Sequence, residues 1–390
     1  MGLSRDAKLL VCFSFPVALS VGLRSVILMP YLAFLGLSEV QMGAVAAAGS
    51  MAMSLTAIPM GILADLRGRK AILVSSRLLV AISDLMFFLS SSFPLLLLAN
   101  SLGGVGAGMA SSSRSAFLAD KTEGEARRWA FTYSFAFFST GSVVGSLLAG
   151  LPDLLMARYG LTVLEATRPL FALCFAFATT SLILILPVGE EFRRPGAGRG
   201  RGLIVRSWGV VARYCLFQAL LGLGSGLVVP WFSYYFLTRF GVELSDVGIL
   251  FALAQALTAL GNLWASKLVS RLGSVRTAVA CQLASLGALL AIPVSPSFAT
   301  ASAFYILRAV LVNMANPVLR AFYMGLLERD ERASGSSLQF TVFWASRSLG
   351  AYGSGFLVEA ASLEAPFLAC SAFYLAASLY LHVAFGRGRA

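Results

Sequence analysis

The fold is indicated most clearly by residues 61–70, which read Gly61-Ile62-Leu63-Ala64-Asp65-Leu66-Arg67-Gly68-Arg69-Lys70. A glycine at position 61 lets two helices approach closely, and one at position 68 allows a tight turn. Asp65 is an acid at a helix end, and Arg69 and Lys70 supply anchoring positive charge beside it. We therefore interpret this stretch as the short loop between two spanning helices.

The composition of the 390-residue chain is that of a membrane protein. Apolar residues make up 58% and charged residues 12%, whereas soluble globular proteins carry about 25% charged residues. So few charges exclude a soluble enzyme of ordinary composition and a disordered chain. The five cysteines all lie within apolar stretches, which excludes a disulfide scaffold.

Twelve apolar stretches follow one another, each long enough for a spanning helix of about 20 residues. They lie at residues 8–35, 40–64, 70–92, 94–118, 128–151, 168–189, 206–238, 243–266, 274–294, 297–324, 334–357 and 364–386. The first is too long for a signal peptide, so we expect it to be a spanning helix. A Gly-, Pro- and Arg-rich segment near the midpoint is typical of a flexible linker. We expect an N-terminal bundle at 1–189, a linker at 190–205 and a C-terminal bundle at 206–390.

Arg and Lys outnumber Asp and Glu by 30 to 18, and the positions of the basic residues fit the expected loop topology. With both termini cytoplasmic, most basic residues flank the inner ends of the stretches, and only Arg158, Arg168 and Arg239 flank the outer ends. This is the positive-inside bias. It predicts a multi-pass protein of the plasma membrane with cytoplasmic termini, and it accounts for the basic charge without nucleic acid.

An internal repeat relates the two halves. Gly68, Gly145 and Gly150 recur 205 residues later as Gly273, Gly350 and Gly355. Several coincidences at one offset, on either side of a central linker, indicate two homologous six-helix halves.

Residues 61–70 closely resemble the loop signature of the major facilitator superfamily, G-x-L-A-D-R-x-G-R-K, with Leu66 in place of a basic residue. The resemblance implies an all-α membrane protein with twelve transmembrane helices in two pseudo-symmetric six-helix bundles, and transport by alternating access. In that family the loop acid and arginine belong to a charge network that stabilises one transport state. The predicted conformational switch comprises Gly61, Asp65, Gly68, Arg69, Lys70 and Asp120. The alternative is an ordinary positive-inside loop.

Residues 141–150 resemble the antiporter-associated motif of the same family, G-x-x-x-G-P-x-x-G-G, with Ser146 in place of Pro and Ala149 in place of Gly. Plain packing is the alternative, because small residues four apart let helices touch backbone to backbone. The predicted helix-packing residues are Gly141, Gly145, Gly150, Gly350 and Gly355.

Charged residues inside the apolar stretches are candidates for function, because they are costly in lipid. In the superfamily, helices 1, 4, 7 and 10 line the cavity, which implies that Arg24 and Arg308 contact substrate; the alternative is structural pairing with carbonyls or with Asp84. Asp84 is the only carboxylate that we place deep in a span, and it is the proton-coupling candidate. The predicted substrate-binding residues are Arg24, Asn100, Gln218, Tyr234, Gln255, Arg308 and Asn313.

We expect proton-coupled efflux of small amphipathic compounds; the alternative is uptake of an organic anion bound by Arg24 and Arg308. The expected partners are a small-molecule substrate, the lipid bilayer and H+. We expect no nucleic acid, no cofactor and no metal, and we expect the protein to be a monomer. A membrane-embedded enzyme would need clustered His, Asp or Glu at membrane depth, so we do not expect an enzyme. Nothing resembles a P-loop, which favours an ion gradient as the energy source.

Overall fold

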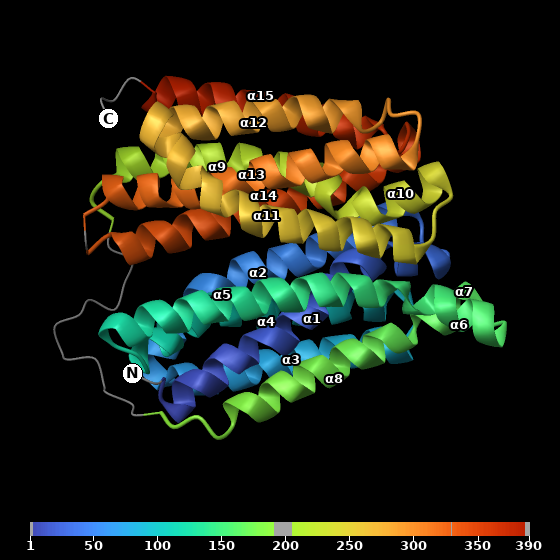
Figure 1. Cartoon of the computed structure of the whole chain (residues 1–390), viewed down its shortest axis with the longest axis horizontal. Helices are drawn as coiled ribbons and strands as arrows, with labels where there is room; N and C mark the ends of the chain where they lie inside the picture. Colours follow the sequence, from blue (N-terminus) through green and yellow to red (C-terminus); the bar gives the residue numbers. More distant parts are fainter. Residues whose placement is uncertain (1–2, 191–204, 329, 387–390) are drawn as a thin grey trace. The chain divides into compact units, whose positions relative to one another are not determined.

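The computed structural model describes residues 3–190, 205–328 and 330–386, which contain helices and no β-strand. Figure 1 shows the helices in chain order. Those of the first half are α1 (Arg5–Phe34), α2 (Glu39–Arg67), α3 (Arg69–Leu89), α4 (Phe93–Asp120), α5 (Gly124–Leu147), η1 (Leu148–Gly150), α6 (Leu151–Tyr159), α7 (Val163–Thr167) and α8 (Pro169–Ile185). Those of the second half are α9 (Trp208–Val228), η2 (Val229–Trp231), α10 (Phe232–Phe240), α11 (Leu244–Leu272), α12 (Ser274–Ala291), α13 (Phe298–Leu326), α14 (Arg332–Ala360) and α15 (Ala365–Phe385).

These helices supply the twelve predicted spans, because α5 to α6, α7 to α8 and α9 to α10 each follow one another closely. In the described part of the chain, 11 helical stretches are long and apolar enough to cross a membrane. The one predicted span that is not among these 11 is α14. It has 29 residues and carries more polar side chains than most of the other spans. The predicted all-α fold is confirmed.

One span runs clearly further than the hydropathy pattern predicts. The fifth begins at Gly124, four residues before the predicted start, and continues through η1 and α6 to Tyr159. Pro152 stands in the first turn of α6, where a missing backbone N–H costs nothing. The seventh also passes through a 3-10 segment, η2, and ends at Phe240, two residues past the predicted end. In the fifth span, polar residues at the end hid the last turns from a pattern based on hydropathy.

The turns before α3 and α12 repeat the same backbone geometry. Gly68 precedes α3 with a φ of 101°, and Gly273 precedes α12 with a φ of 79°. Residues with a Cβ rarely adopt positive φ, so both turns depend on glycine. These residues are one of the pairs on which the predicted repeat rests.

The chain divides into two compact units. Unit 1 comprises Met1–Leu37, Ala48–Arg201 and Glu243–Ala252; unit 2 comprises Ser38–Ala47, Gly202–Val242 and Leu253–Ala390. In unit 1, α1 packs against α5 and α8, and α3 packs against α4 and α8. In unit 2, α9 packs against α14 and α15, and α12 packs against α13 and α15.

The contact between α1 and α5 is made backbone to backbone. A Cβ on Gly22 of α1 would overlap the carbonyl oxygen of Ser142, and a Cβ on Gly145 of α5 would overlap that of Leu19. Glycine on each helix therefore faces a carbonyl on the other. Such contacts are how small residues hold membrane helices together.

The contact between α9 and α14 in unit 2 has the same construction. A Cβ on Gly226 of α9 would overlap the carbonyl oxygen of Arg347, and a Cβ on Gly350 of α14 would overlap that of Leu223. Each of these residues lies 204 or 205 positions after its counterpart in the first pair. The repeat is thus visible in atomic contacts as well as in residue types.

Candidate functional site

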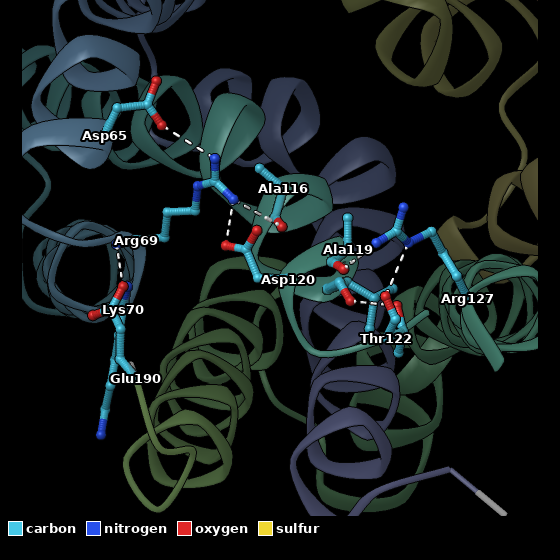
Figure 2. A network of polar contacts seen from close by, with 10 residues as sticks. Asp65, Arg69, Lys70, Ala116, Ala119, Asp120, Thr122, Arg127 and Glu190 are labelled. Atoms are coloured by element: carbon cyan, nitrogen blue, oxygen red, sulfur yellow. Dashed lines mark hydrogen bonds and ion pairs between the residues drawn. The ribbon is translucent and has the colours of Figure 1, made fainter. Parts of the chain in front are cut away.

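One guanidinium group joins the ends of three helices of unit 1. Arg69, the first residue of α3, donates from Nη2 to Oδ1 of Asp65 on α2 at 3.2 Å. Its Nη1 donates to the carbonyl oxygen of Ala116 at 3.1 Å and forms an ion pair with Asp120 at the end of α4. Figure 2 shows Arg69 between the two carboxylates. The structure therefore brings together three of the four charged residues predicted to form the switch: Asp65, Arg69 and Asp120.

Glu190, which sequence reasoning assigned to the linker, is part of the same network. Its Oε1 accepts the backbone N–H groups of Arg69 at 2.5 Å and of Lys70 at 3.1 Å. These N–H groups lie at the N-terminus of α3, where they lack partners within the helix and favour negative charge. Lys70 in turn donates from Nζ to the carbonyl oxygen of Leu186 at 2.6 Å. Leu186 and Glu190, which follow α8, thus bind to the loop of residues 61–70.

The end of α4 is held by a second arginine, Arg127 of α5. Its Nε donates to the carbonyl oxygen of Thr122 and its Nη2 to that of Ala119, each at 3.0 Å. Both contacts are drawn in Figure 2. The final carbonyls of a helix lack intrahelical partners, so Arg127 fixes the position from which Asp120 reaches Arg69.

A second cluster lies in the interior of unit 1. Nη1 of Arg24 is 2.5 Å from Oδ1 of Asp84, whose side chain is fully buried. Nη2 of Arg24 donates to Oδ1 of Asn100 at 2.9 Å, and its Cζ lies 4.9 Å from the centre of the Phe87 ring. Among the described residues, none donates a hydrogen bond to Oδ2 of Asp84. The cluster joins three predicted site residues: Arg24, Asp84 and Asn100.

Arg77 of α3 is a further buried arginine of unit 1. It is 6% exposed, donates to Oγ of Ser76 at 2.9 Å and lies 5.9 Å from the centre of the Phe13 ring. Its interactions stay within the bundle, which supports a structural role.

Arg308 of α13, in unit 2, has aromatic neighbours instead of an acid. It is 5% exposed, and its Cζ lies 4.9 Å from the centre of the Phe232 ring and 5.9 Å from that of Tyr374. Nη2 of Arg308 donates to Oη of Tyr374 at 3.5 Å. Its buried Nε has no hydrogen-bond partner among the described residues.

The remaining predicted substrate-binding residues are spread over unit 2. Gln218 of α9 donates to the side chain of Gln339 on α14. Tyr234 of α10 lies beside Trp231, with ring centres 6.0 Å apart. Asn313 of α13 donates to a carbonyl within its own helix at 2.8 Å.

Gln255 lies on a different helix again, α11. The hydrogen bonds of Gln218 and Asn313 go to other residues than Arg308, whose own contacts are with aromatic side chains.

The predicted helix-packing glycines lie at close contacts or in buried positions. A Cβ on Gly141 would lie 2.7 Å from the carbonyl oxygen of Phe15 on α1. Gly150 is buried in η1 and Gly355 is buried in α14. Gly61, assigned to the switch, is half-buried within α2.

The loop before α14 contains a site that sequence reasoning missed. Oε1 of Glu331 accepts the backbone N–H groups of Arg206 and of Ser207, the latter at 2.9 Å. Burial by itself raises the pKa of Glu331, but the hydrogen bonds from Ser207 and Arg206 outweigh it and hold that pKa below its ordinary value. An acid just before a helix was the only signal in the sequence, because the partner backbone lies more than 120 positions away.

In the ranges that the structure describes, no three His, Cys, Asp or Glu side chains gather to hold a metal ion.

Comparison with known proteins identifies one family. A sequence model described as Major Facilitator Superfamily matches residues 10–214 and again 214–389. The repeated match agrees with the two pseudo-symmetric halves.

Two curated relatives are similar in sequence. The quinolone resistance protein NorA of Staphylococcus aureus (strain MRSA252) is 29% identical over 136 residues, which span 35% of this chain and 35% of the relative. Multidrug resistance protein 2 of Bacillus subtilis (strain 168) is 25% identical over 290 residues, 71% of this chain and 69% of the relative. The match to the first relative thus spans about a third of its length.

Two solved structures share the fold. A point mutant of the nucleoside transporter NupG has a TM-score of 0.80 with 14% identity, and the match covers 97% of this chain and 99% of the transporter. A bacterial homolog of the human lysosomal transporter Spinster has a TM-score of 0.74 with 18% identity, covering 97% and 96%. At these identities the likeness concerns the fold alone.

Proposed function

Because the chain belongs to the Major Facilitator Superfamily, we propose that it is a secondary active transporter that exports small amphipathic compounds in exchange for protons. Transport proceeds by alternating access of the two bundles, residues 1–189 and 206–390, joined by the linker 190–205. The protein is a multi-pass membrane protein. We place it in the plasma membrane with both termini in the cytoplasm, on the positive-inside bias of its loops.

The direction of transport and the class of solute rest on two kinds of support. The relatives in Staphylococcus aureus and Bacillus subtilis are named for resistance to quinolones and to multiple drugs. Residues 141–150 resemble an antiporter-associated motif of the family. Both point to export.

The observation that carries proton coupling is the buried carboxylate of Asp84. One of its oxygens is paired with Arg24, and the other accepts no hydrogen bond from the described residues. Protonation of Asp84 would neutralise the carboxylate and weaken its hold on Arg24. Arg24, whose side chain is 17% exposed, would then be free to change partner. A proton and Arg24 thus compete for one carboxylate, and this competition supports proton coupling through Asp84.

The network around Arg69 supplies the conformational switch of this transporter. Its ion pairs join α2, α3 and α4, and Glu190 adds the segment that follows α8. Partly exposed ion pairs of this kind contribute little to stability, so they can break and re-form as the bundles move.

Uptake of an organic anion bound by Arg24 and Arg308 is the second candidate function. The observation in its favour is that Arg308 is buried beside aromatic rings and forms no salt bridge with the described residues. Arg24 supports it less, because Asp84 already compensates its charge.

Transport by the purified full-length chain in proteoliposomes tests the proposal. We expect an imposed pH gradient to drive accumulation of a fluorescent quinolone. Asp84→Asn should lose this accumulation but keep solute exchange at equal pH, because exchange needs no net proton movement. Loss of both activities would mark Asp84 as structural, and gradient-independent transport by the unmodified protein would refute coupling. Gradient-driven uptake of benzoate with no quinolone transport would favour the second candidate.

A further inference from the structure

Asn100 of α4 is the uncharged partner of Arg24. Its Oδ1 accepts a hydrogen bond from Nη2 of Arg24 at 2.9 Å, while Nη1 of the same guanidinium group is paired with Asp84. The side-chain amide of Asn100 does not titrate, whereas the carboxylate of Asp84 can take up a proton. Arg24 therefore has one partner on α3 that responds to pH and one partner on α4 that does not.

A glycine leaves room for the guanidinium group on the side of α4. A Cβ on Gly103 of α4 would lie 3.8 Å from Nη1 of Arg24 and 2.8 Å from Oγ of Ser83. A longer side chain at this position would therefore crowd the ion pair. Nη1 also donates to Oγ of Ser83 at 3.4 Å. When Asp84 is protonated and loses its charge, Arg24 can keep Asn100 and shift toward α4.

Asn100 also lies against α2. A Cβ on Gly49 of α2 would lie 2.5 Å from Nδ2 of Asn100, and a Cβ on Gly104 of α4 would overlap the carbonyl oxygen of Gly49. The two helices are thus in backbone contact directly beside Asn100. The amide oxygen of Asn100 binds Arg24 and its amide nitrogen faces Gly49, so a displacement of Arg24 acts on both α4 and α2.

The two helices that meet at Asn100 carry the two carboxylates of the switch. Asp65 lies near the C-terminal end of α2 and Asp120 ends α4, and Arg69 forms an ion pair with each. Partly exposed ion pairs are weak. A small change in the spacing of α2 and α4 is therefore enough to change how firmly Arg69 joins them.

Other charged or titratable groups also face Asp84. Arg77 on α3 and the thiol of Cys174 on α8 lie within electrostatic range of its carboxylate. The charged residues of α4 lie nearer its C-terminal end: Arg114 and Asp120. In the part of the chain that the structure describes, Arg24 is the neighbour of Asp84 that also donates a hydrogen bond to a side chain of α4.

We propose that Asn100 is a positioning residue that links the protonation of Asp84 to the switch around Arg69. It holds Arg24 at α4 when Asp84 is neutral, and through Gly49 it passes the resulting displacement to α2. This role deepens the proposed function, on which it rests, by naming the path between the proton site and the switch. It also differs from the substrate contact that the sequence predicts for Asn100.

Two measurements on the purified full-length chain test this role without a solute or a gradient. Infrared difference spectra between about pH 8 and about pH 5 detect the carbonyl band of a protonated carboxyl group, and the band that is lost in Asp84→Asn belongs to Asp84. Hydrogen–deuterium exchange, corrected for the intrinsic effect of pH, reports the opening of residues 61–70. Ordinary aspartate side chains stay charged over this range, because their reference pKa is about 3.9.

In the unmodified protein we expect acid pH to produce the Asp84 band and to speed exchange at residues 61–70 at least about fivefold. Asn100→Ala should keep the Asp84 band but lose most of the pH effect on residues 61–70, because Arg24 no longer acts on α4 and α2. Asn100→Ser, which is polar but too short to reach Arg24, should do the same and serves if the Ala variant does not fold.

Ser101→Ala is the matched control, because Ser101 is the next residue of α4 and donates to the carbonyl oxygen of Leu97 within its own helix at 2.8 Å. It should leave both signals unchanged. A full pH effect on residues 61–70 in folded Asn100→Ala would overturn the role. Loss of both signals would mark Asn100 as part of the structure of the ion pair, and no pH effect in the unmodified protein would leave nothing to transmit; each also overturns it.

Transport in proteoliposomes separates this inference from the proposed function. If the chain shows no proton-coupled transport while the Asn100-dependent response of residues 61–70 persists, the proposed function fails and the role of Asn100 stands. If transport is coupled to protons and the response does not depend on Asn100, the proposed function stands and the role of Asn100 fails.

Discussion

Arg24 and the fully buried Asp84 form an ion pair between α1 and α3, with 2.5 Å between Nη1 and Oδ1, and the Arg24 side chain is 17% exposed. Two charges removed from water are stable there only because each compensates the other. Removing one partner leaves the other buried and unpaired, which costs about 3–5 kcal/mol in comparable cases. The pair therefore ties the stability of unit 1 to the same carboxylate that we propose for proton coupling.

A double-mutant cycle on this pair should show strong coupling. We expect Asp84→Asn to lower the free energy of unfolding by about 3–5 kcal/mol, because Arg24 is left unpaired. The double variant Arg24→Gln/Asp84→Asn should lose clearly less than the sum of the two single changes. Chemical unfolding in detergent, followed by tryptophan fluorescence, measures all four proteins. Additive losses would mean that the two side chains do not interact.

The ion pairs of Arg69 should behave in the opposite way, affecting transport more than stability. Asp65 is 62% and Asp120 52% exposed, and exposed pairs are worth less than about 1 kcal/mol. Asp65→Asn and Asp120→Asn should therefore keep near-normal unfolding and surface expression while slowing transport several-fold. Glu123→Gln is the control, because Glu123 is exposed nearby at the start of α5 and makes no side-chain cap. Unchanged transport rates in both Asn variants would refute the switch.

The fold was predictable because it depends on local patterns. Apolar length predicts the spans, and residues 61–70 identify the loop. The offset between Gly145 and Gly350 reveals the repeat, and the structure places both glycines against a leucine carbonyl of the partner helix. Helix ends were less predictable. The polar last turns of α6 are helical because the chain continues through η1, which hydropathy does not register.

The site was predictable where a family motif and the acidic end of a predicted helix pointed to it, and unpredictable where neither signal was present. Asp65, Arg69 and Asp120 meet as predicted. Glu190 was missed because capping the N-terminus of α3 requires that α8 end beside it, a fact of tertiary structure. Tyr374 was missed for the same reason, since nothing in its own segment distinguishes it from a core aromatic residue.

The glycine contacts between paired helices should be sensitive to a single methyl group. A Cβ on Gly145 would overlap the carbonyl oxygen of Leu19, and one on Gly350 that of Leu223. We expect Gly145→Ala and Gly350→Ala each to lower stability by about 1–3 kcal/mol, because the helices must move apart. Gly353→Ala is the control on α14, since a Cβ there meets nothing within 4 Å; it should be neutral or slightly stabilising. Equal effects at positions 350 and 353 would contradict the packing argument.

Glu331 should make the stability of unit 2 dependent on pH in the acid range. Its pKa in the folded protein lies below the ordinary value because Ser207 and Arg206 donate hydrogen bonds to it, against the effect of burial. A carboxyl with a lowered folded pKa stabilises the protein above its unfolded pKa of about 4.3, and that contribution is lost as pH falls through the folded pKa. Glu331→Gln should therefore lower the unfolding temperature at pH 7, and the difference from the unmodified protein should shrink as pH falls below about 4. Glu328→Gln, which removes an exposed partner of Arg206 at 3.6 Å, should change the unfolding temperature far less. A difference between Glu331→Gln and the unmodified protein that stays constant down to the lowest pH would show that the charge of Glu331 does not hold the start of α9.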